Sequence, residues 1–121
     1  METVSRLRIV RWAFACLLAL ACAGVQVHPI GVTAGKAEDF FTQLELAAKR
    51  RGYTVARPRG VVNVKTAEGD WLQYDVDAQK KEVLLTIVPN ADNLSDTEIA
   101  ARQEKLRALS DELVAEARRT M

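Results

Sequence analysis

Four short apolar segments, separated by links of only a few residues, occupy positions 53–88 and constrain the fold more than any other feature of the sequence. Apolar and polar residues alternate within them, as in Val62-Asn63-Val64-Lys65, which predicts strands with one dry and one wet face. Links this short join neighbouring strands as antiparallel hairpins. We therefore predict a four-stranded antiparallel sheet made of Tyr53–Ala56, Val61–Thr66, Trp71–Asp77 and Glu82–Val88.

The last of these segments differs from the others, because Val83-Leu84-Leu85-Thr86-Ile87-Val88 is apolar at nearly every position. A strand that is apolar at nearly every position is typical of a buried place in a sheet. We expect it to be the most buried strand, ending at Pro89.

A helix is predicted before the strands, over residues 37–51. Phe40, Leu44 and Ala47 fall on one face of it at helical spacing. Acidic residues occupy its first turn and basic residues its last, as the helix dipole favours. Gly52 follows as the stop.

A second helix is predicted after the strands. Ser95-Asp96-Thr97-Glu98 has the sequence of a capping box, and the helix that it opens ends at Arg118-Arg119. The order of elements is then αββββα, an α+β fold with both helices on the dry face, forming a single domain over residues 36–121. The core face of the second helix is expected to hold Ile99, Leu106, Leu109, Leu113, Val114 and Ala117.

The N-terminus has the layout of a signal peptide. Three arginines within residues 1–11 precede Trp12–Ala21, ten residues without a charge. A spanning helix needs about 20 apolar residues, so a permanent anchor is the weaker interpretation. We predict an exported protein with a signal peptide over residues 1–21.

The end of this segment, Leu18-Ala19-Leu20-Ala21-Cys22, resembles the lipobox of bacterial lipoproteins. The resemblance covers residues 1–24. It implies cleavage before Cys22, lipidation of the Cys22 thiol and a lipid anchor in the cell envelope. Since Ala23 is not the Asp that resembles an inner-membrane retention signal, it also implies the outer membrane, facing the periplasm. Ordinary signal peptidase cleavage beside Ala21 or Ala23 is the alternative, and it would release a soluble periplasmic or secreted protein.

The stretch between the lipobox and the first helix shows no regular period. Gly24, His28-Pro29, Gly31 and Gly35 interrupt it. We interpret residues 22–35 as a lipidated N-terminus followed by a flexible tether.

Composition argues against several kinds of chemistry. Both cysteines, Cys16 and Cys22, precede the predicted domain, and His28 is the single histidine. We therefore expect no metal site built from cysteine or histidine ligands, and we assign no metal ligand and no cofactor. A formal net charge of +1 gives no reason to expect nucleic-acid binding.

One group of carboxylates is the only candidate for catalysis. Glu68, Asp70, Asp75 and Asp77 crowd around one predicted hairpin and could offer a carboxylate pair or a calcium site. Asp75 and Asp77, however, alternate with apolar residues as a solvated strand face does. An enzyme is thus the least favoured interpretation, and we assign no catalytic residue.

Two features are candidates for binding a partner. Five basic residues fall within positions 49–59, where they could contact an anionic lipid, an anionic glycan or an acidic envelope protein, although helix-end and turn charges explain them equally. A tryptophan on the polar face of a strand could anchor a partner. We predict a noncatalytic binding or scaffolding module, with a secreted regulator or inhibitor as the alternative; the candidate residues are Trp71, Arg57, Arg59, Lys49, Arg50 and Arg51.

Overall fold

The computed structural model describes residues 25–121 and combines an antiparallel sheet with two α-helices. The α+β class and the antiparallel sheet predicted from the sequence are therefore confirmed. Two short 3-10 turns, Ala34–Lys36 and Pro58–Gly60, lie between the main elements. The main elements are β1 (Gln26–Thr33), α2 (Ala37–Arg50), β2 (Thr54–Ala56), β3 (Val62–Lys65), β4 (Trp71–Asp77), β5 (Glu82–Val88) and α3 (Asp96–Arg119).

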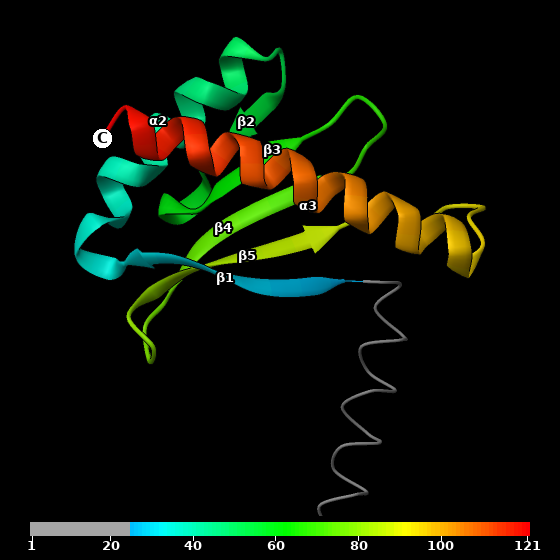
Figure 1. The fold of residues 1–121 in the computed structure, drawn as a ribbon, viewed down its shortest axis with the longest axis horizontal. Coiled ribbons are helices and arrows are strands. Elements are labelled where there is room, and N and C mark those ends of the chain that lie inside the picture. The colour runs from blue at the N-terminus through cyan, green and yellow to red at the C-terminus, as the bar shows by residue number, and fades with distance from the viewer. Residues whose placement is uncertain (1–24) are drawn as a thin grey trace, which may run out of the picture.

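The molecule has two layers, with α2 and α3 packed side by side on one face of the sheet (Figure 1). The strand order is β1-β5-β4-β3-β2. Alternate residues of β3, β4 and β5 are buried beneath the helices, as the alternating pattern predicts. The core includes Phe40, Phe41 and Leu44 from α2, Leu106, Leu113 and Ala117 from α3, and Val62, Val64, Leu72, Tyr74, Val83, Leu85 and Ile87 from the sheet.

The prediction of four strands is wrong, because residues 26–33 of the expected tether form a fifth strand, and the order of elements becomes βαββββα. β1 pairs antiparallel with β5 through Gln26↔Ile87 and Pro29↔Leu84. Its irregular sequence suits an edge position. Pro29 cannot donate a ladder hydrogen bond, and the register shifts before Thr33, near Gly31 with its φ of +78°.

The added strand explains the unusual composition of β5. In a four-stranded meander β5 would have been an edge, but here it lies between β1 and β4. Val83, Leu85 and Ile87 are buried beneath the helices, and Leu84 and Val88 are half-buried on the other face. As an inner strand, β5 has a neighbour on each side in the sheet, and none of its residues is fully exposed.

The buried residues of α3 all lie at or after Leu106, so its first turns contribute little to the core. The capping box is present, since the Glu98 amide donates to Ser95 Oγ at 3.2 Å and the Ser95 amide donates to Glu98 Oε1 at 3.3 Å. Ile99, expected in the core, is only half-buried, because the first turns of α3 extend past the sheet (Figure 1). The buried residues of α3 are Leu106, Ser110, Leu113, Val114 and Ala117.

One buried polar contact joins the sheet to α3. Tyr74 Oη and Ser110 Oγ lie 2.6 Å apart, and neither residue is exposed to solvent. Burial raises the pKa of the Tyr74 phenol, so the pair is neutral and each hydroxyl depends on the other for a partner.

We expect Tyr74→Phe to lower the free energy of unfolding by about 1–3 kcal/mol, because it leaves the Ser110 hydroxyl buried without a partner. Adding Ser110→Ala should recover part of that loss, since the unsatisfied group is then removed as well. Urea denaturation of Tyr74→Phe, Ser110→Ala and the double variant measures this. A double variant that loses the sum of the two single losses would mean that the hydroxyls are not coupled.

Candidate functional site

The helices leave the second face of the sheet uncovered, and this open face is the first candidate site. Trp71 lies on it, 36% exposed, paired with Val88 on one side and Lys65 on the other. The Lys65 ammonium is 5.3 Å from the centre of the Trp71 ring, within cation–π range. A shallow hollow of about 290 Å³ is lined by Asn63, Trp71, Gln73 and Val88. The open face comprises the outward residues Val27, Pro29, Thr54, Ala56, Asn63, Lys65, Trp71, Gln73, Asp75, Asp77, Glu82, Leu84, Thr86 and Val88.

The predicted basic residues do not gather on this face, and Arg57 shows why. Its guanidinium lies 3.2 Å from Glu38 Oε1 and 3.3 Å from Glu45 Oε1, and it stacks 5.7 Å from the centre of the Phe41 ring. The same Glu45 accepts a hydrogen bond of 2.8 Å from Lys49. The Lys49 ammonium, and after it the Arg57 guanidinium, hold the pKa of Glu45 below its ordinary value.

Arg50 and Arg51 tie α2 to α3. Arg50 donates two hydrogen bonds to Glu116 Oε1, at 3.0 and 3.2 Å. Arg51 contacts Glu112 at 2.8 Å and Glu116 at 3.3 Å. The guanidinium groups of Arg50 and Arg51 lower the pKa of Glu116, and Arg50 has the larger effect. Four of the five basic residues therefore have acidic partners within the domain, and Arg59 lies exposed in a turn with a φ of 53°.

Asp70, one of the carboxylates considered for catalysis, is 2% exposed and joins three segments of the chain. Its carboxylate accepts hydrogen bonds from the backbone N–H of Asn90 at 2.7 Å and from the Thr66 hydroxyl at 3.2 Å. Arg102, on the first half of α3, donates to both carboxylate oxygens at 3.3 and 3.4 Å. Asp70 thus fastens the β3–β4 turn and the loop after β5 to α3, and no sequence pattern pointed to Arg102 as its partner.

Asp75 and Asp77 lie away from Asp70. Asp70 precedes β4 on the helix side, whereas Asp77 is its last residue, about 20 Å along the strand at the usual rise. Asp77 Oδ1 accepts from the amides of Gln79 and Lys80, which closes the β4–β5 turn. The structure therefore separates Asp70 from Asp75 and Asp77, which are two residues apart on one face of β4. Within residues 25–121, no group of three or more His, Cys, Asp or Glu side chains is placed to hold a metal ion.

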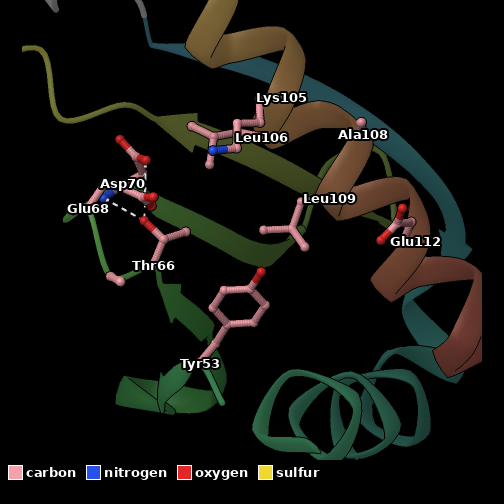
Figure 2. A pocket seen from close by; sticks show the side chains of 10 residues that line it. Tyr53, Thr66, Glu68, Asp70, Lys105, Leu106, Ala108, Leu109 and Glu112 are labelled. Carbon is pink, nitrogen blue, oxygen red and sulfur yellow. Dashed lines mark hydrogen bonds between the residues drawn. The ribbon is translucent and has the colours of Figure 1, made fainter. Parts of the chain in front are cut away.

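A cavity of about 480 Å³ lies between α3 and the β3–β4 turn (Figure 2). Figure 2 shows Thr66, Glu68 and Asp70 at one end of it, with Tyr53 and Leu109 in the middle. Because the Asp70 carboxylate already accepts hydrogen bonds from three residues, it serves as a structural support of this cavity.

Cys22 and the signal peptide lie outside the described residues, so the structure leaves both as predictions. No helix in the part of the chain that the structure describes is long and apolar enough to cross a membrane.

Comparison of the chain with protein-family models, curated proteins and solved structures found no match.

Proposed function

We propose that the chain is an exported lipoprotein of the bacterial cell envelope, held by a lipid on Cys22, whose domain is a noncatalytic binding or scaffolding module. The basic, apolar and lipobox-like segments of residues 1–22 support the anchor. By the same resemblance, Ala23 favours the outer membrane, facing the periplasm.

The open face is the observation that best supports a binding role. Both helices pack on the other side of the sheet, so the open face has no covering layer among residues 25–121. Trp71 is exposed on it beside a shallow hollow. Large aromatic side chains that remain partly exposed are common anchors for partners.

The basic residues support this role less strongly. Lys49, Arg50, Arg51 and Arg57 already pair with glutamates of α2 and α3, so an acidic partner would have to displace those contacts. An enzyme that used the hairpin carboxylates would have to rely on Asp75 and Asp77, because Asp70 lies at the other end of β4 and already accepts hydrogen bonds from three residues.

We expect Cys22→Ser to prevent lipidation of the full-length chain. The variant should leave the membrane fraction or accumulate as an uncleaved precursor, and it should lose the lipid-dependent shift in gel mobility. Cys16→Ser is the matched control, because it removes the other cysteine of the same segment and should leave fractionation unchanged.

Other outcomes would favour the alternatives. A wild-type protein that is already soluble in the periplasm or medium would indicate ordinary cleavage and a released regulator or inhibitor. A Cys22→Ser variant that remains membrane-bound with unchanged mobility would contradict lipidation.

A further inference from the structure

We infer that the open face binds the lipid bilayer to which the protein is anchored, with Trp71 at the level of the lipid headgroups. The inference rests on the proposed lipid at Cys22 and goes further, since it names the partner of the open face.

The first argument is the short distance between the lipidated residue and the domain. Only residues 23–25 separate Cys22 from Gln26, the first residue of β1. Four Cα–Cα steps span at most about 14 Å even when fully extended. The domain would therefore be held against the membrane surface.

The second argument is where Trp71 lies relative to this attachment. Gln26 pairs with Ile87, and Ile87 pairs with Leu72, the neighbour of Trp71. β1 and β4 are separated by β5 alone, so about 10 Å lie between them at the usual strand spacing. Trp71 is thus at the end of the sheet nearest to Cys22.

The third argument is the distribution of charge over the open face. The half nearest to Gln26, here called the Trp71 end, carries a single charged residue, Lys65. Acidic residues are confined to the other half, at Asp75 and at the paired Asp77 and Glu82. The Trp71 end consists of Val27, Thr54, Ala56, Asn63, Lys65, Trp71, Gln73, Thr86 and Val88.

This composition suits the interface of a membrane. Tryptophan is enriched at the headgroup level, where its ring is partly apolar and its indole N–H remains hydrated. Lys65 would contact lipid phosphates beside it, and Val27, 57% exposed, would add apolar area. The acidic residues Asp96, Glu98 and Glu104 at the same end of the domain belong to α3, in the layer on the opposite side of the sheet, so repulsion by an anionic bilayer would turn the helices away from it and the open face toward it.

Trp71 is itself the probe for the test. It is the single tryptophan of residues 22–121, and Trp12→Phe removes the other whether or not the leader is cleaved. The lipidated full-length product would be reconstituted in vesicles of phosphatidylethanolamine and phosphatidylglycerol, with bromine atoms on the acyl chains near the headgroups. We expect the Trp71 emission to shift to shorter wavelength, to be quenched by brominated lipid, and to show several-fold less quenching by acrylamide than in detergent.

The control moves the tryptophan to the helix layer. Leu46 is 45% exposed on α2, so Leu46→Trp in a chain that also carries Trp12→Phe and Trp71→Phe should stay accessible to acrylamide and escape lipid quenching. Equal acrylamide quenching at both positions, without lipid quenching, in a protein of confirmed lipid mass would overturn the inference and leave the anchor intact. A product without lipid mass would instead contradict the proposed function.

Discussion

Replacing Leu85 with alanine is expected to lower the free energy of unfolding by about 2–5 kcal/mol, as truncation of a buried leucine does. Leu85 has no exposed surface and lies in β5, between His28 of β1 and Tyr74 of β4. The alanine leaves a cavity beneath the helices that the paired strands cannot close without distorting two ladders. Urea denaturation followed by circular dichroism would measure the loss.

Leu84→Ala is the matched control for this prediction. Leu84 is the preceding residue of the same strand, but it lies half-buried on the open face. Its truncation removes less apolar surface from contact and leaves no enclosed cavity, so we expect a loss of about 1 kcal/mol or less. If the two variants lost equal stability, the two faces of β5 would not differ in burial as described.

Replacing Asp70 with alanine is expected to cost about 2–4 kcal/mol. The change removes the shared acceptor of the Asn90 amide, the Thr66 hydroxyl and the Arg102 guanidinium. Removal of one partner from a buried ion pair is costly because the other partners remain without it. Arg102 is partly exposed and can be hydrated, so the cost should stay below that of a fully buried pair.

The effect of Asp70→Ala should also be localised. Amide hydrogen exchange should accelerate most in the loop after β5 and in the first turns of α3, where Asp70 supplies the tertiary contacts to Asn90 and Arg102. Asp75→Ala, on the exposed face of β4, the strand that follows Asp70, should change stability by no more than about 0.5 kcal/mol. A loss as small for Asp70→Ala as for Asp75→Ala would contradict the structural role of Asp70.

The strands of the 53–88 region were predictable because their signals are local. Alternation in β3 and β4 and the short turns between them depend on neighbouring residues alone, and the capping box of α3 is read within four positions. β1 was missed because Pro29 and Gly31 are typical of loops, and only pairing with a strand more than fifty residues away makes them part of a sheet. The one available signal was β5, whose nearly continuous apolar sequence is more typical of an inner strand than of the edge strand of a four-stranded meander.

The side-chain contacts of the candidate sites were less predictable. The basic residues of positions 49–59 lie close together in the sequence, but Arg50 and Arg51 pair with Glu116 and Glu112 of α3, more than sixty residues away. Arg57 pairs with Glu38 and Glu45 of α2. Asp70 presented the same difficulty. In the sequence, Asp70 lies within seven residues of Asp75 and Asp77 and is grouped with them. In the structure, its carboxylate instead contacts Asn90, in the loop after β5, and Arg102 of α3.

The measurement that tests the anchor most directly is the intact mass of the wild-type protein purified from the membrane fraction. We predict a chain that begins at Cys22, with a mass that exceeds residues 22–121 by a diacylglyceryl group alone or with one further acyl chain. An unmodified mass, for a chain that begins at Cys22, at Gly24 or at Met1, would contradict the lipoprotein assignment and, with it, the close approach of the Trp71 end to the bilayer.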